Sequence, residues 1–256
     1  MNTETSGNQA TEDDIQEELL DSQPFMSHLI EFRDRVLRSV VAVLVVFIGL
    51  FSFSEELYLY VSEPIREYLP ASSTMIATEV ASPFLTPFKL TLVLSLFAAM
   101  PFILYQAWAF LAPGLYQREK KIVVPLFISS VLLFYGGMAF AYYIVFPLVF
   151  MFFTSIAPEG ISVMPDIRSY LDFVLKLFFA FGISFEIPIA VVILSWMGVV
   201  EPDNLAKKRP YVFVMCFILG MLLTPPDIIS QILLAIPMWL LFELGILFGR
   251  MVKPKD

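Results

Sequence analysis

The stretch LDFVLKLFFAFGISFEIPIAVVILSW, residues 171–196, is almost continuously apolar. An α-helix needs about 20 mostly apolar residues to cross the roughly 30 Å of hydrocarbon in a bilayer, so this stretch is long enough to span a membrane. The composition agrees, because 58% of the 256 residues are hydrophobic and only 16% are charged, whereas about a quarter of the residues in soluble domains are charged. The sequence therefore predicts an all-α, polytopic membrane protein.

Five further apolar stretches bring the number of expected transmembrane helices to six. The fifth would be only about 20 Å long at 1.5 Å per residue. Pro225, Pro226 and Asp227 then lead directly into the sixth, so we expect short fifth and sixth helices in a hairpin that thins the membrane locally. The six expected spans are residues 36–53, 88–110, 122–146, 171–196, 211–223 and 228–248.

The basic residues predict the orientation of these spans. Of the 16 Lys and Arg residues, all except Arg66, Lys89, Arg168 and Lys176 lie in four groups. Cytoplasmic loops carry an excess of Lys and Arg, so both termini, the second–third loop and the fourth–fifth loop are expected in the cytoplasm. The four groups are Arg33, Arg35 and Arg38; Arg118, Lys120 and Lys121; Lys207, Lys208 and Arg209; and Arg250, Lys253 and Lys255.

The two ends of the chain differ from its middle. Residues 1–23 are acidic and contain no Lys or Arg, and such a segment buries too little apolar surface to fold. We therefore expect a disordered tail over residues 1–23, a transmembrane domain over residues 24–250 and a short cytoplasmic tail over residues 251–256.

Prolines recur within or at the ends of the spans, and each removes a backbone donor and tends to kink its helix. They predict a kinked, curved and open bundle. The alternative is that these prolines have no special role, since proline is common in membrane helices. The residues concerned are Pro101, Pro125, Pro147, Pro188 and Pro237.

Several kinds of catalytic chemistry have no counterpart in the sequence. There is no phosphate-binding loop of the form GxxxxGK[ST]. The only histidine, His28, precedes the first span, which argues against a Ser-His site or a His-based zinc site within the membrane. No pair of aspartates lies at mid-depth. We therefore expect no catalytic residues, no metal site, no cofactor and no nucleic-acid partner, and favour a receptor or scaffold.

Three carboxylates stand out. Glu186 lies inside the fourth span, where a charge is costly; it lines a functional polar cavity or joins helices by hydrogen bonding. Glu31 lies four residues before Arg35 on an amphipathic segment, which is the spacing of an ordinary ion pair on a helix. Glu119 lies among basic neighbours in the second–third loop, as a solvated acid would.

The fifth–sixth hairpin carries two polar side chains close to its turn. Thr224 ends the fifth span and Gln231 begins the sixth, so the two are expected at similar depth near the outer face. They either hydrogen-bond to each other or form a docking site for a helix that carries a polar residue.

At these residues the chain resembles the TatC family, the receptor subunit of the twin-arginine protein translocase. The resemblance covers nearly the whole chain after the acidic tail, whose length departs from the shorter N-termini of the family. It rests on SHLIEFRDR (27–35), MIATEVASPF (75–84), FLAPGLYQREKK (110–121), FAYYIVFPL (140–148), SFEIP (184–188), KKRPY (207–211) and LLTPPD (222–227).

The resemblance implies export of folded proteins across the bacterial inner membrane. Their signal peptides carry paired arginines, and the proton-motive force supplies the energy. It implies several copies per complex and single-span TatA- and TatB-type subunits as partners. By matching positions, it assigns signal-peptide recognition to Glu31, Arg33, Phe110 and Glu119, the intramembrane acid to Glu186, partner docking to Met221, Thr224 and Gln231, and roles not specified further to Pro64, Tyr142 and Asp227. A proton-coupled small-solute carrier, with Glu186 as its proton site, is the alternative hypothesis.

Overall fold

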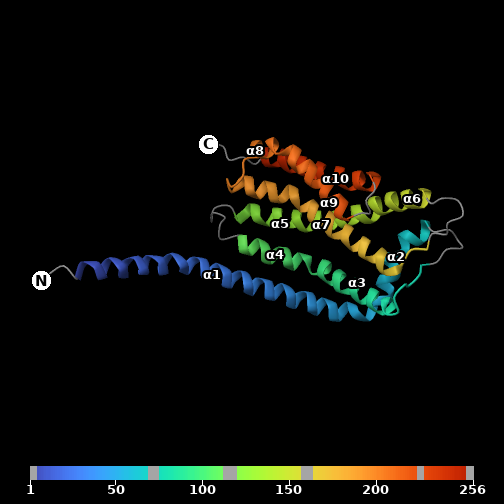
Figure 1. Cartoon of the computed structure of the whole chain (residues 1–256), viewed down its shortest axis with the longest axis horizontal. Coiled ribbons are helices and arrows are strands. Elements are labelled where there is room, and N and C mark those ends of the chain that lie inside the picture. The colour runs from blue at the N-terminus through green and yellow to red at the C-terminus, as the bar shows by residue number, and fades with distance from the viewer. Residues whose placement is uncertain (1–4, 69–74, 112–119, 157–163, 224–227, 252–256) are drawn as a thin grey trace.

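The computed structural model describes residues 5–68, 75–111, 120–156, 164–223 and 228–251, and these residues are helical almost throughout. The helices form one elongated bundle (Figure 1). They are α1 (Thr5–Leu50), α2 (Ser54–Tyr68), α3 (Ser82–Ala98), α4 (Met100–Leu111), α5 (Lys120–Phe140), α6 (Phe146–Ile156), α7 (Ile167–Trp196), α8 (Pro202–Lys207), α9 (Arg209–Leu223) and α10 (Ile228–Met251).

All six predicted spans are helices. Among the described residues, four stretches are long and apolar enough to cross a membrane: Met26–Glu63, Val124–Phe153, Ile167–Trp196 and Ile228–Met251. The second predicted span is the bent pair of α3 and α4, and the fifth is α9, a short apolar helix of 15 residues. By contrast, α10 has 24 residues and is longer than the short sixth helix that the sequence predicts, because the helix continues past Phe248 to Met251.

Prolines shape two of the spans. The axes of α3 and α4 differ by 48° at a break just before Pro101, which confirms the predicted kink at this proline. A π-helical turn, Ala141–Val145, joins α5 to α6 just before Pro147. Such turns are a known way to accommodate an interruption of the helical hydrogen-bond ladder. Pro125, Pro188 and Pro237 lie inside α5, α7 and α10.

Helix α7 is the centre of the bundle, and glycines let its neighbours approach closely. On the side of α5, Gly137 lies against the backbone of Phe181, and Gly182 of α7 lies against the ring of Phe134. On the side of α10, Gly245 and Gly249 lie against Pro188 and Ser195 of α7. Small residues four apart are a common basis for packing between membrane helices.

Helix α1 lies along one edge of the bundle, against α3 and α4 (Figure 1). None of the residues in its apolar membrane-spanning window is buried, so this helix faces lipid or other subunits. Helix α1 begins at Thr5, so the acidic tail is helical from there on and projects from the bundle (Figure 1). The expectation of disorder over residues 1–23 remains a prediction.

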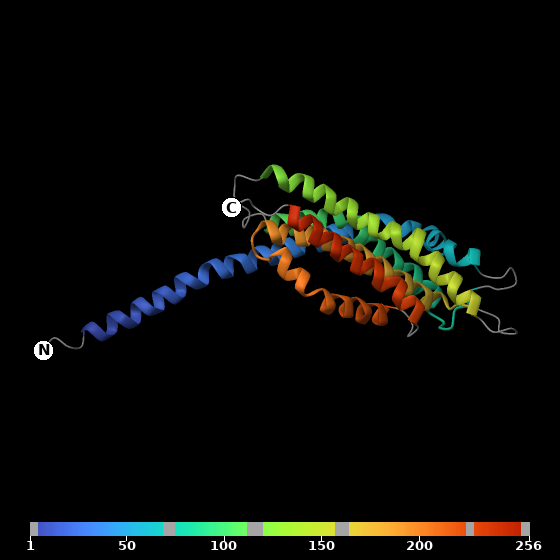
Figure 2. The ribbon, with the colours of Figure 1, turned by 90° about the horizontal axis from the view of Figure 1, so that it is seen from above.

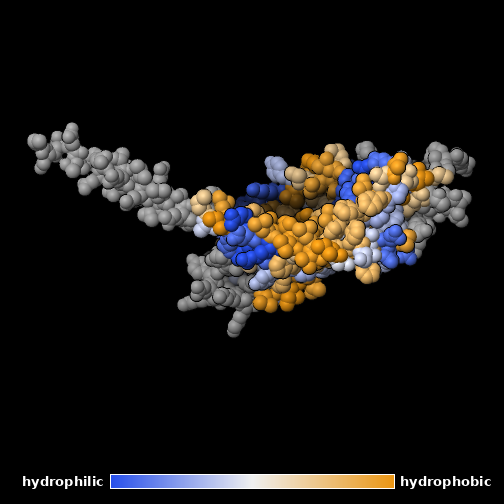
Figure 3. All heavy atoms as spheres, turned by 90° about the horizontal axis from the view of Figure 1, so that it is seen from below, coloured by the Kyte–Doolittle hydropathy of each residue, from blue (hydrophilic) through white to orange (hydrophobic). Residues whose placement is uncertain are grey.

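The bundle is open on one face. Figure 2 shows α9 set off at the edge of the bundle, where it packs mainly on α10. Figure 3 shows a broad hydrophobic surface, hollowed near its middle, between two ends that carry hydrophilic residues. This distribution suits a protein whose middle lies in hydrocarbon and whose ends lie in water.

Candidate functional site

The N-terminal part of the first span packs against the end of α4 through three rings. The ring of His28 stacks on that of Phe110 with 4.1 Å between the centroids, and the ring of Phe32 lies 5.6 Å from it. The motif SHLIEFRDR therefore meets Phe110, the first residue of FLAPGLYQREKK, at one end of the bundle, although some 80 residues of chain separate them.

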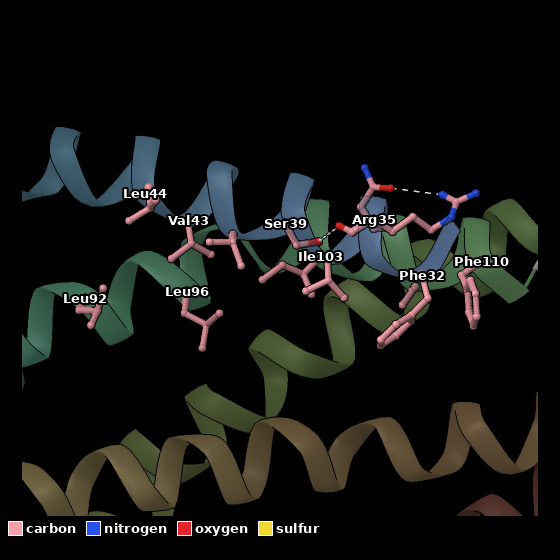
Figure 4. Close-up of a pocket in the computed structure, with 13 residues that line it drawn as sticks. Phe32, Arg35, Ser39, Val43, Leu44, Leu92, Leu96, Ile103 and Phe110 are labelled. Carbon is pink, nitrogen blue, oxygen red and sulfur yellow. Dashed lines mark hydrogen bonds between the residues drawn. The ribbon is translucent and has the colours of Figure 1, made fainter. Parts of the chain in front are cut away.

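Arg35 joins these two segments. Its guanidinium donates to Glu31 on α1 at 2.5 and 3.0 Å, and it also donates to the side-chain oxygen of Gln106 at 3.2 Å and to the carbonyl of Ala109 at 3.1 Å. Gln106 is buried, so this network lies partly inside the protein and holds the Glu31 carboxylate in a fixed position. Figure 4 shows Arg35 beside Phe32 and Phe110.

Of the four residues expected to recognise the signal peptide, the structure brings two together. Glu31 and Phe110 both lie beside His28, whose ring stacks on that of Phe110 and whose Nδ1 is 3.9 Å from Glu31 Oε2. Arg33 is largely exposed and pairs with its neighbour Asp34 at 2.8 Å. Glu119 lies outside the described residues. Sequence reasoning did not assign a role to Gln106 or Ala109. Gln106 is a polar residue within an apolar span, and this signal could have found it, whereas nothing distinguishes Ala109.

An apolar groove of about 620 Å³ begins at this network and runs between α1 and the α3–α4 pair. Figure 4 shows Val43, Leu44, Leu92 and Leu96 along it. Apart from Arg35, Ser39 and Gln106, its lining is apolar. Charged and aromatic side chains thus lie at one end of the groove, and the apolar part of the groove follows the membrane-spanning part of α1.

Glu186 lies at the contact between α7 and α5. The hydroxyl of Ser130 donates to its Oε2 at 2.5 Å, whereas its buried Oε1 has no hydrogen-bond partner among the described residues. The carboxyl group thus takes part in helix packing through one oxygen, while the other remains available for a further donor.

In the fifth–sixth hairpin, Gln231 faces α9. Its side-chain amide donates to the carbonyl of Phe217 at 2.8 Å, and it packs against Gly220. Met221 is exposed. Thr224 and Asp227 lie outside the described residues, so both alternatives, the pairing of Thr224 with Gln231 and a docking site for a partner helix, stay open.

Tyr142 lies in the π-helical turn and contacts α2. Its hydroxyl donates to the carbonyl of Tyr60 at 3.2 Å, and the two rings stack with 5.8 Å between their centroids. Tyr170 of α7 likewise donates to the carbonyl of Val61 at 2.9 Å. These tyrosines hold α2 against the bundle just before Pro64, whose side chain lies outside the described residues.

The motif MIATEVASPF is held by Asp166, the N-cap of α7, which sequence reasoning missed. The carboxylate of Asp166 accepts hydrogen bonds from the backbone N–H and the hydroxyl of both Ser169 and Thr78, at 2.9 to 3.1 Å. These bonds, with that from the Ser169 backbone N–H first among them, lower the pKa of Asp166 to about 2. Glu79 of the motif pairs with Arg168, so two adjacent contacts fasten the segment before α3 to the start of α7.

The comparisons with known proteins agree with this geometry. A family model described as Sec-independent protein translocase protein (TatC) matches residues 27–237. The chain belongs to the TatC family. The TatC protein of Azotobacter chroococcum is 60% identical over 233 residues, which are 91% of each chain. That of Escherichia coli K12 is 58% identical over 230 residues, 90% of this chain and 89% of the relative.

A solved structure agrees as well. The crystal structure of a twin arginine translocase receptor TatC superposes with a TM-score of 0.80 at 36% identity, covering 88% of this chain and 99% of that one. The all-α membrane fold expected from the sequence is therefore the TatC fold, and the chain is a subunit of a protein translocase rather than an enzyme. Among the described residues, no cluster of His, Cys, Asp and Glu could hold a metal ion.

Proposed function

We propose that this protein is the receptor subunit of a twin-arginine translocase in the bacterial inner membrane, with both termini in the cytoplasm. It would bind the signal peptides of folded precursors and assemble TatA- and TatB-type single-span subunits, in several copies per complex, for export driven by the proton-motive force. Membership in a protein translocase family weighs against the small-solute carrier.

One observation carries this proposal: Glu31 and Phe110 both lie beside His28, and Arg35, which bonds Glu31, and Phe110 both line the apolar groove. A twin-arginine signal peptide presents guanidinium groups followed by an apolar stretch. A fixed carboxylate can accept two parallel hydrogen bonds from a guanidinium, which an ammonium cannot reproduce. The aromatic ring and the groove would then receive the apolar stretch.

The loop with Glu119 follows directly after α4 in the chain. We assign Glu119 as the main partner of the arginine pair and Glu31 as a second contact. The basic residues beside them, among them Arg33, Arg118 and Lys120, would repel cationic peptides that cannot form the paired hydrogen bonds.

Site-specific photo-crosslinking tests the receptor role. A photoreactive amino acid at Glu31, Phe110 or Glu119 should capture an exported precursor in membranes, and capture should fail when the precursor carries two lysines in place of its arginines. The same probe at the exposed Glu201, on the fourth–fifth loop, serves as the control. Equal capture of both precursors would refute recognition of the arginine pair at these positions.

We assign partner docking to Met221, Thr224 and Gln231 at the end of the fifth–sixth hairpin. The exposure of Met221 leaves a surface there for a partner helix. Thr224→Val with Gln231→Leu removes donors and acceptors while it keeps bulk, and hydrogen bonds between membrane helices contribute about 0.6 kcal/mol on average. The double variant should therefore fold but crosslink less to a single-span partner. Crosslinking at the level of the unchanged protein would refute docking here.

A further inference from the structure

A second groove lies between α3, α7, α9 and α10, away from the Arg35 network. Its volume is about 490 Å³, and its walls are mostly apolar, with Val93, Phe179, Ile183 and Leu219 among them. Two cations and one acid, Lys89, Lys176 and Asp172, lie at its polar end. The groove thus has an apolar body and a charged end.

A smaller polar cavity of about 230 Å³ adjoins that charged end, because Lys89 and Asp172 line both spaces. Two hydroxyls in its lining, Ser82 Oγ and Thr86 Oγ1, are buried and have no hydrogen-bond partner among the described residues. A buried hydroxyl without a partner costs free energy, so the cavity is suited to a ligand that carries oxygen atoms.

The depth of the two spaces follows from the helices that form them. Ser82 and Arg168 are at the very start of α3 and α7, at the end of the bundle opposite to the Arg35 network (Figure 1). Lys89 lies about 10 Å beyond Ser82 along α3, and Lys176 lies about 12 Å beyond Arg168 along α7, at 1.5 Å per residue. The polar cavity is therefore at the depth of lipid headgroups, and the apolar groove lies deeper.

The charges favour a phosphate. Lys89 pairs with Asp172 at 2.5 Å and Arg168 pairs with Glu79. No carboxylate in the described part of the chain lies within ion-pairing distance of Lys176. The two spaces together carry three cations and two acids, and the excess cation, Lys176, lies in the lining of the groove one helical turn from Asp172.

The lining of the groove favours an acyl chain. From Lys176 to Ser184 the groove follows α7 for about 12 Å at 1.5 Å per residue. Along that length its lining is apolar, with Phe179, Ala180 and Ile183 among the residues that α7 contributes. A long apolar surface that continues from a charged end suits a lipid, which combines an acyl chain with a charged headgroup.

We propose that this surface is a binding site for one glycerophospholipid of the outer leaflet. Its phosphate lies at the polar cavity, where Ser82 and Thr86 donate hydrogen bonds to it and the side chains of Lys89 and Lys176, which lean back toward the starts of their helices, pair with it. Its ester groups and an acyl chain follow deeper, along Phe179 and Ile183.

A photoactivatable phospholipid tests this site on the full chain. The probe is a phosphatidylglycerol with a diazirine in one acyl chain, added to the detergent-purified protein, and crosslinked peptides are mapped by mass spectrometry. Crosslinks should map to α7 around Ala180 and Ile183. Lys176→Gln should reduce this capture about fivefold, since that factor corresponds to one basic residue near an anionic lipid surface. Lys208→Gln, an exposed lysine at the other end of the molecule, should leave capture unchanged.

Two further measurements decide between occupants. A diacylglycerol with the same diazirine chain but no phosphate should be captured less than the phospholipid and should not respond to Lys176→Gln. Equal capture of the two probes, or equal capture by Lys176→Gln and the unchanged protein, would overturn the proposal. So would the loss of lipid capture when a single-span subunit is present, together with crosslinks from Ile183 to that subunit.

Discussion

The guanidinium of Arg35 donates two hydrogen bonds to one oxygen of Glu31, at 2.5 and 3.0 Å, while it also reaches α4 at Gln106 and Ala109. Glu31 is therefore held in place before any ligand arrives. Its second oxygen lies 3.9 Å from His28. An incoming guanidinium would meet a carboxylate whose position α4 helps to determine.

Arg35→Lys keeps the charge but loses the planar group that bonds Glu31 and α4 together. Hydrogen bonds to charged groups contribute about 1.5–3 kcal/mol, so we expect the affinity for a twin-arginine signal peptide to fall at least about tenfold. Fluorescence anisotropy of a labelled peptide with the protein in nanodiscs measures this. Arg38→Lys, one turn further along the exposed side of α1, is the matched control, and equal affinities in the two variants would contradict the positioning role.

Glu119 should be the more sensitive of the two carboxylates. Glu119→Ala is expected to abolish precursor binding while the protein remains in the membrane, and Glu119→Gln should be nearly as severe because it removes the charge that strengthens the pair. Glu31→Ala should weaken binding without abolishing it. The control is Glu201→Gln, a change of the same kind on another exposed loop. Binding at the wild-type level in the double variant Glu119→Ala, Glu31→Ala would refute the assignment.

Local pattern predicted the elements of this fold but not the contacts that build the site. The apolar runs predicted the six helices, and Pro101 predicted the bend between α3 and α4. The spacing of Glu31 and Arg35 predicted their ion pair. By contrast, Arg35 and Gln106 are 71 positions apart, and Thr78 and Asp166 are 88 apart. Such contacts depend on which helices pack together, which periodicity within one helix does not encode.

The carboxyl group of Glu186 is expected to matter for export more than for folding. Its hydrogen bond from Ser130 should contribute about 0.6 kcal/mol, the average between membrane helices. Both Glu186→Gln and Glu186→Leu should therefore accumulate in the membrane, with loss of precursor export as their main effect. Immunoblots of membranes and an export assay separate the two readouts, and Ser130→Ala provides the control for the hydrogen bond alone. Failure of both Glu186 variants to accumulate would instead assign the residue to helix packing.

The hydrogen bonds that the Asp166 carboxylate accepts from Thr78 and Ser169, here called the Asp166 clasp, should be lost in acid. The carboxylate's folded-state pKa of about 2 lies below the ordinary value of about 3.9. The stabilisation is therefore complete above about pH 4 and is lost as the pH falls through about 2. Asp166→Asn should remove most of it at neutral pH, and loss of an N-cap costs about 0.5–2 kcal/mol.

Hydrogen exchange measures this loss. The backbone N–H of Ile76 donates to Pro165 and that of Thr78 donates to Asp166, so both amides should exchange faster in Asp166→Asn after correction for intrinsic rates. Asp203→Asn, on α8 at the other end of the bundle, leaves the hydrogen bonds of Asp166 in place and serves as the control. Unchanged protection at Thr78 in Asp166→Asn would show that the carboxylate does not hold this segment.

Two adjacent glycines of α5 provide the sharpest test of the packing around α7. A Cβ on Gly137 would lie 2.5 Å from the carbonyl oxygen and 2.9 Å from the carbonyl carbon of Phe181, whereas a Cβ on Gly136 would meet nothing within 4 Å. The backbone of α7 cannot move aside cheaply, so Gly137→Ala should destabilise the protein by at least about 1–3 kcal/mol, the usual cost of overpacking. Gly136→Ala should be neutral or slightly stabilising, because alanine favours the helix over glycine.

The single cysteine, Cys216, is buried in α9, so its labelling by a thiol reagent during unfolding in increasing SDS reports the transition in both variants. Coincident transitions for the two variants would mean that α5 and α7 are not in close contact at Gly137.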